Sequence, residues 1–214
     1  MPPEPPSQPE TRPPETRPYV SAKREAAAAK KRQAVIEAAG RLLAEGPAMM
    51  SMEAVARAAG VTRLTVYKQF GSRRGLLEAV FDDNAARSGM VRQMLAAMNH
   101  PAPCQGLDDV IDVMCGFWGA HPQFARLHDA GASDPEFAEA LNERNQRRKW
   151  VLGKLLAQMP GDAQARQSAL DLIFGVTSMP MFRSLAVDYP PDVVAQMMKK
   201  AAHAILTAYG LQAD

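Results

Sequence analysis

Cysteine, aromatic side chains and long apolar runs are all scarce in this sequence of 214 residues. Its two cysteines, Cys104 and Cys115, are too few for a disulfide framework and show no metal-ligand spacing, so we expect free, buried thiols in a reducing compartment. No apolar run is long enough to span a bilayer, and the N-terminus carries no apolar signal segment. The sequence therefore predicts a cytoplasmic protein with no membrane segment.

The motifs that carry catalysis are missing as well. There is no Ser-His-Asp order, nucleophile elbow, P-loop, dinucleotide fingerprint or metal motif. His121 and His128 are separated by Pro122, and no carboxylate completes a set of metal ligands with them. The sequence therefore predicts no catalytic residue, no metal and no cofactor.

Alternating apolar and polar residues, the pattern of a half-buried strand, are also absent. Apolar residues recur instead at helical spacing between proline and glycine breaks, which predicts an all-α fold of about nine helices. The expected helices cover 22–45, two short segments within 51–71, and 72–98, 107–120, 123–129, 134–159, 163–187 and 192–209.

Proline is concentrated at the N-terminal end, where residues 1–18 hold eight of the seventeen. Few large apolar side chains accompany these prolines, so residues 1–20 are expected to form a disordered tail. A solvated extension is favoured over a recruitment motif as the interpretation of this tail.

The most informative stretch that is present is 51–74, SMEAVARAAGVTRLTVYKQFGSRR. Gly60 stands where a first short helix should end, because glycine tolerates the positive φ of a tight turn. Thr62 is a good N-cap for a second helix, in which Val66 and Phe70 are expected to face inward. A turn glycine followed by a polar, basic second helix predicts a helix-turn-helix.

Charge is unevenly divided between the two ends of the chain. Residues 21–75 hold eleven Lys or Arg against four Glu, a balance of +7. Residues 81–214 hold twelve basic and fifteen acidic residues, a balance of −3. A basic N-terminal module on a slightly acidic body is expected when one end of a protein meets a polyanion.

The run AVIEAAGRLLAEGPAMMSMEAVARAAGVTRLTVYKQFGSRRGLLEAVF, residues 34–81, closely resembles the DNA-binding domain of the TetR family of transcriptional regulators. The tightest part is AAGVTRLTVYKQFGSRRGLL, with its Tyr-x-x-Phe ending and its Gly-Ser-basic entry to the next helix. The resemblance implies a three-helix DNA-binding head over 21–71 and a larger helical domain over 72–214 that binds ligand and dimerises.

The second helix of the motif carries the expected DNA contacts. Arg63 can bind guanine through O6 and N7, and Thr65 can contact thymine. Leu64 departs from the small residue or proline expected there, and either a thymine methyl contact or packing against the neighbouring helix could explain it. The base-reading set is therefore Arg63, Leu64, Thr65 and Lys68, and the phosphate-binding set is Thr62, Tyr67, Gln69, Ser72 and Arg73. Gly75 is a second departure, which has no functional explanation in the sequence.

The larger domain offers a mostly aromatic and thioether set of residues that could line an apolar ligand pocket. Each of these is individually more typical of a core than of a pocket. The candidates are Met114, Phe117, Trp118, His121, Phe124, His128, Trp150, Phe174 and Met179.

The resemblance also implies a homodimer formed through the helices at 163–187 and 192–209, whose apolar stripes are broader than one seam requires. The predicted function is that of a transcriptional regulator, a repressor that binds a palindromic operator in double-stranded DNA and is released by a small apolar or aromatic effector. The alternative is a dimeric DNA-binding or partner-recruiting module that has no small-molecule effector.

Overall fold

The computed structural model describes residues 18–131 and 134–211, and within these ranges every regular element is a helix. This confirms the all-α prediction, while most of the proline-rich tail, 1–17, lies outside the described residues. No helix in the described ranges is both long and apolar enough to cross a membrane. The elements are α1 (Pro18–Glu45), the short 3-10 helix η1 (Pro47–Met49), α2 (Met52–Ala58), α3 (Arg63–Phe70), α4 (Arg73–Arg87), α5 (Met90–Met98), α6 (Pro103–Ala120), α7 (Gln123–Ala130), α8 (Pro135–Leu156), α9 (Ala163–Val176), α10 (Met179–Leu185) and α11 (Pro191–Ala208).

Two expected helices are each divided into two, which raises the number of α-helices in the described residues from the predicted nine to eleven. The expected helix at 72–98 breaks at Gly89, whose φ of 73° ends α4 in the left-handed conformation that glycine adopts readily. The expected helix at 163–187 breaks at Thr177 and Ser178, and Pro180 then occupies the first turn of α10. Helix α6 also begins earlier than expected, with Pro103 in its first turn.

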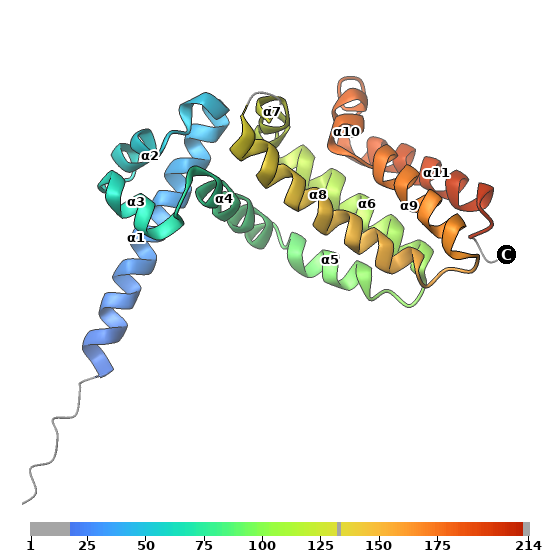
Figure 1. Ribbon diagram of the computed structural model, residues 1–214, viewed down its shortest axis with the longest axis horizontal. Helices are drawn as coiled ribbons and strands as arrows, with labels where there is room; N and C mark the ends of the chain where they lie inside the picture. The colour runs from blue at the N-terminus through green and yellow to red at the C-terminus, as the bar shows by residue number, and fades with distance from the viewer. Residues whose placement is uncertain (1–17, 132–133, 212–214) are drawn as a thin grey trace, which may run out of the picture.

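Helices α1, α2 and α3, which we call the head, lie at one end of the molecule, and α5 to α11, which we call the body, occupy the rest (Figure 1). Helix α4 connects the two. The head core is small and combines buried residues of the C-terminal half of α1, such as Val35 and Leu43, with Val55 of α2 and Val66 of α3. The N-terminal half of α1 extends away from this core (Figure 1).

The body is built on α6 and α8, and α9, α10 and α11 lie at the end far from the head (Figure 1). Leu107 and Ile111 of α6 are fully or almost fully buried, as are Leu152 and Leu155 of α8. Phe124 of α7 joins the same core and stacks on Phe81 of α4, with ring centroids 3.8 Å apart. Helix α4 therefore contributes side chains to the core of the body as well as to that of the head.

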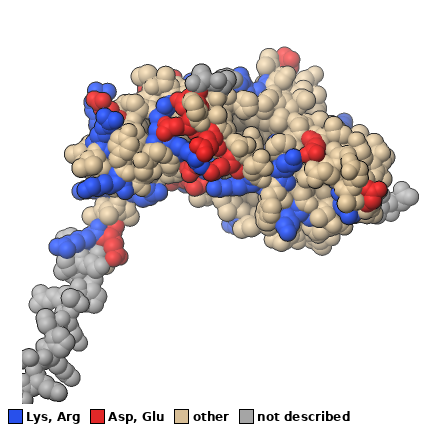
Figure 2. All heavy atoms as spheres, in the orientation of Figure 1, with Lys and Arg blue, Asp and Glu red and all other residues tan. Residues whose placement is uncertain are grey.

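Ionic contacts also join α4 to α8. Arg73 pairs with Asp134 at 2.8 Å and covers the ring of Phe137 at 4.1 Å. Arg74 forms ion pairs with three carboxylates, and Arg144 of α8 pairs back with Asp82 of α4 at 2.8 Å. We call this set the ionic junction; its members are Arg73, Arg74, Arg144, Glu78, Asp82, Asp134, Glu139 and Glu143. Figure 2 shows acidic and basic side chains interleaved midway along the molecule, with Lys and Arg on the head beyond them.

Candidate nucleic-acid interface and cavity

The connection from α2 to α3 has the geometry of a Schellman turn. Gly60 has a φ of 66°, as the sequence predicts. Its N–H donates to the carbonyl of Arg57 at 3.3 Å, and the N–H of Val61 donates to the carbonyl of Ala56 at 3.0 Å. These two bonds satisfy carbonyls that the end of α2 would otherwise leave unpaired, so they fix the angle at which α3 leaves the turn.

Thr62 caps α3, also as predicted. Its Oγ1 accepts a hydrogen bond from the N–H of Thr65 at 3.1 Å, and the two threonine hydroxyls lie 2.8 Å apart. Val66 is fully buried, and Phe70 is half-buried beneath the guanidinium of Arg32, 4.3 Å from the ring centre. Two inward side chains thus anchor the helix and leave its remaining faces to solvent.

The exposed face of α3 carries most of the predicted base-reading residues. Arg63, Leu64 and Lys68 are exposed, and Thr65 is half-buried beside its cap. The Leu64 side chain is 62% exposed, which excludes packing against a neighbouring helix as the reason for a leucine at this position. Arg63 lies over the ring of Tyr67 at 5.3 Å, and its hydrogen bond to the phenol oxygen raises the pKa of the guanidinium.

The residues expected at phosphates are divided between two environments. Tyr67 is exposed beside Arg63, and Ser72 caps α4 by accepting from the N–H of Gly75 at 3.0 Å, which leaves its hydroxyl hydrogen available. Gln69 is half-buried, with an Oε1 that is buried and has no hydrogen-bond partner among the described residues. Arg73 belongs to the ionic junction, so a phosphate contact by this residue remains a prediction that would require it to leave Asp134.

Gly75 has a structural explanation that the sequence did not reveal. A Cβ at this position would lie 2.2 Å from the carbonyl oxygen of Phe70, well inside contact distance. The close approach arises where α3 ends and α4 begins, because the N–H of Ser72 donates to the same carbonyl at 2.8 Å. Glycine therefore allows two helices to follow each other with only Gly71 and Ser72 between them.

A cavity of about 300 Å³ lies in the body among α4, α5, α6, α7 and α8, with Met179 at the start of α10. Its volume is at the lower end of the range typical of ligand pockets. Seven of the nine residues proposed for a pocket line this cavity: Met114, Phe117, Trp118, Phe124, His128, Trp150 and Met179. Trp150 lies at the edge of the described surface, where it is 55% exposed and the ammonium of Lys154 lies 5.6 Å from its ring centre.

The other two proposed pocket residues, His121 and Phe174, are not among those that line the cavity. His121 stacks on Phe117 with centroids 4.4 Å apart, and its Nδ1 lies 2.9 Å from the carbonyl oxygen of the same residue. Phe174 lies under the guanidinium of Arg148, 4.1 Å from the ring centre. Both aromatic rings are therefore held by neighbouring side chains.

Sequence reasoning missed two groups of cavity residues. Met90, Met94 and Met98 follow each other at intervals of four residues along α5, so they form one helical stripe facing the cavity. Their spacing predicts an apolar face on the helix expected at 72–98, but it does not indicate what that face borders. Three arginines of α8, Arg144, Arg147 and Arg148, also line the cavity, and a polar stretch of helix gives no signal for that position.

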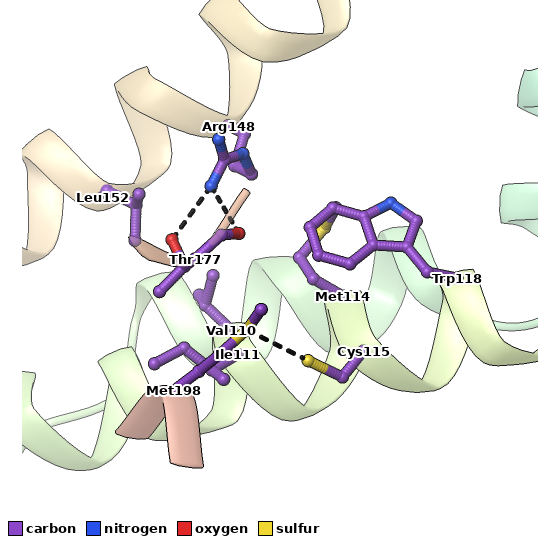
Figure 3. Close-up of a pocket in the computed structure, with 9 residues that line it drawn as sticks. All are labelled: Val110, Ile111, Met114, Cys115, Trp118, Arg148, Leu152, Thr177 and Met198. Carbon is purple, nitrogen blue, oxygen red and sulfur yellow. Dashed lines mark hydrogen bonds between the residues drawn. The ribbon is translucent and has the colours of Figure 1, made fainter. Parts of the chain in front are cut away.

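Beside the cavity, a smaller pocket is filled by its own side chains and has no room for a water molecule (Figure 3). Cys115 lies in its wall and donates a hydrogen bond to the sulfur of Met198 at 3.6 Å. Burial raises the pKa of the Cys115 thiol to about 12, so Cys115 is an inert, buried thiol as expected, whereas Cys104 is only half-buried. Among the described residues, no group of three His, Cys, Asp or Glu side chains is placed to hold a metal ion.

The head matches a known protein family. Residues 35–80 match the family described as bacterial regulatory proteins, tetR family. No curated protein matches the chain.

Several solved structures share the fold over most of the chain. A TetR-like transcriptional regulator from Rhodococcus sp. RHA1 is 20% identical, with a TM-score of 0.61 over 83% of this chain and 96% of that one. The regulator FadR from Bacillus subtilis, solved in complex with stearoyl-CoA, is 18% identical, with a TM-score of 0.62 over 79% of this chain and 96% of that one. A putative TetR-family regulator from Mesorhizobium loti is 17% identical, with a TM-score of 0.59 over 85% and 97%.

Proposed function

We propose that this chain, whose residues 35–80 match the tetR family of bacterial regulatory proteins, is a ligand-responsive DNA-binding repressor that binds a palindromic operator as a homodimer. The single observation that carries the DNA-binding part of this proposal is the geometry of α3. A capped, anchored helix presents Arg63, Leu64 and Lys68 to solvent on a basic head.

The exposed apolar residues of the last three helices support a homodimer. Leu172 of α9, Met181 of α10, and Val193 and Met197 of α11 are each at least 36% exposed. Side chains of this kind gathered on adjacent helices are typical of an interface between subunits. A twofold dimer also places two recognition helices about one turn of DNA apart, which is the spacing that a palindromic operator requires.

The cavity in the body supports an effector and disfavours the alternative of a DNA-binding module without one. A ligand shifts the DNA-binding equilibrium only by its differential affinity for the two states of the protein. The cavity is suited to this because α4, which lines it through Phe81, Asp82 and Ala85, also carries the head. FadR from Bacillus subtilis, which shares the fold, was solved with stearoyl-CoA bound.

The test begins with selection of a binding site from randomised double-stranded DNA, followed by binding measurements on two variants. Arg63→Ala should weaken discrimination at one base pair in each half-site by about tenfold to a hundredfold, because a bidentate arginine–guanine contact contributes ~1–3 kcal/mol. Arg57→Ala is the matched control, since Arg57 is an exposed arginine of the head that lies on α2 instead of α3. It should weaken binding to all sequences equally, if at all.

An unchanged sequence preference in Arg63→Ala would contradict the role of that residue. Failure to select any DNA sequence would contradict the proposed function as a whole. Sedimentation of the purified chain tests the dimer separately, and a monomer at micromolar concentration would contradict that part of the proposal.

A further inference from the structure

Arg148 is a buried cation for which the described residues provide no carboxylate partner. It is only 6% exposed, and among the described residues no Asp or Glu lies within ion-pairing distance of it. The ionic-junction arginines Arg73, Arg74 and Arg144 each pair with at least one carboxylate. Burial of a charge costs free energy unless it is paired, so the environment of Arg148 needs a separate explanation.

The hydrogen bonds of Arg148 account for only part of its guanidinium. Nη1 donates to the carbonyl and the hydroxyl of Thr177 at 2.8 and 2.9 Å (Figure 3). Nη2 donates to the carbonyl of Phe174 at 3.0 Å. These acceptors lie at the C-terminal end of α9, where a cation is favoured by the helix dipole. The Nε–H is buried and has no acceptor among the described residues.

The guanidinium remains charged in this position. Burial lowers its pKa to about 10, which is still well above neutral pH. A cationic side chain with an unused, buried N–H can therefore bind an anion that enters from outside the protein.

The cavity provides the route and the rest of the binding surface. Arg148 lines it together with Arg144 and Arg147, and Asp82 is the one carboxylate among the described residues that line it. Asp82 is itself paired with Arg144, so the lining carries an excess of positive charge. Much of the remaining lining is apolar and includes the methionines of α5 together with Met114 and Trp118 of α6.

Resting on the proposed function, we propose that the effector is an amphipathic acid, whose anionic group pairs with Arg148 and whose apolar part occupies the methionine-lined cavity. A fatty acid and an aromatic acid share this chemistry. In both, a carboxylate can accept from the free Nε–H in a charge-assisted hydrogen bond. The Met90, Met94 and Met98 stripe adapts to either shape, because methionine is flexible and polarizable.

The test compares acids with their uncharged methyl esters. Decanoate and phenylbutanoate, each with its ester, are titrated into the full-length chain and followed by tryptophan fluorescence. The chain has two tryptophans, Trp118 and Trp150, and both line the cavity. At least one acid should bind about tenfold to a hundredfold more tightly than its ester, which corresponds to a hydrogen-bonded charge pair. Equal affinities, or no binding by either acid, would overturn the inference.

Variants of two arginines then locate the anion. Arg148→Met should remove the preference for the acid, and Arg148→Lys should keep part of it, because lysine retains the charge without the planar fork. Arg92→Met is the matched control, since it removes an exposed arginine of α5 that is not among the cavity-lining residues, and it should keep the preference. Preference retained in Arg148→Met, or lost in Arg92→Met, would show that the anion is bound elsewhere or that Arg148 only caps α9.

Two further measurements keep the result interpretable. If Arg148→Met does not fold, by far-ultraviolet circular dichroism, the wild-type comparison and Arg148→Lys still decide the question. DNA binding without ligand is measured separately on the selected site. If the chain shows no preference for the acid but still binds the selected DNA, only the effector class is refuted. If the chain does not bind DNA, the proposed function is refuted, and the ratio of acid to ester affinity still stands.

Discussion

Two glycines of α6 allow the same substitution to be tested in opposite environments. A Cβ at Gly106 would lie 2.5 Å from the carbonyl oxygen of Ala97 and 2.8 Å from Cδ2 of Leu155. At Gly116, which is exposed on the same helix, no atom lies within 4 Å of the added carbon. Helix α5 therefore packs against α6 at a distance that only glycine permits at position 106.

Gly116→Ala should have a higher free energy of unfolding than the wild type. Gly106→Ala should have a lower free energy of unfolding than Gly116→Ala. Alanine is favoured over glycine in a helix interior by about 1 kcal/mol, and this gain applies to both variants. At Gly106 the backbone of α5 must also move by about 0.8 Å, because carbon and oxygen atoms approach to about 3.3 Å. Overpacking of this kind costs ~1–3 kcal/mol, so the two variants should differ by that amount.

Urea unfolding of both variants at one protein concentration measures this difference, and equal concentrations are needed because the proposed dimer would make stability depend on concentration. In thermal unfolding the same difference corresponds to roughly 2 to 12 °C for a chain of this size. Two variants that shift by the same amount in the same direction would refute the close approach of α5 and α6. Gly116→Ala is the control, because its stabilisation measures the preference of the helix for alanine over glycine.

Two further predictions concern the N-cap of α3 and the cysteines. Thr62→Ala should lower the free energy of unfolding by about 1 kcal/mol in urea, because the N–H of Thr65 loses its acceptor. Thr62→Ser keeps the hydroxyl and should stay near wild type, so equal losses in both would contradict the cap. Iodoacetamide at pH 8 should label Cys104 well before Cys115 by mass spectrometry, because burial raises the pKa of Cys115 to about 12 and leaves it 1% exposed. Equal labelling rates in the folded chain would contradict this.

The sequence was most informative where local chemistry determines the structure. Gly60 adopts the expected positive φ, and Thr62 and Ser72 cap the expected helices, because each of these features depends on neighbours a few residues away. The all-α class followed from periodicity for the same reason. Gly89 is a signal of the same local kind, and its left-handed conformation divides the helix expected at 72–98 into α4 and α5.

Features that depend on distant packing could not be predicted in the same way. Arg148 lies in a polar run of α8 that resembles a solvated face. It is buried because α8 packs against the C-terminal end of α9, where Arg148 binds the carbonyl of Thr177. Arg73 was assigned to phosphate because it closely follows the recognition helix, whereas its position is set by Asp134 and Phe137, some sixty residues further along the chain. The methionines of α5 recur at helical spacing, which indicates an apolar face, but a single sequence does not show that this face borders a cavity.

The ionic junction has a consequence for how salt acts on this protein. The side chains of Arg73, Arg74 and Arg144 are 20–26% exposed, so dissolved ions partly screen the pairs that hold α4 against α8. Added salt therefore acts twice: it competes with the head for phosphates, and it loosens the attachment that orients the head. The slope of log affinity against log salt concentration should thus exceed the value set by phosphate contacts alone. A count of DNA phosphates read from that slope would be too high.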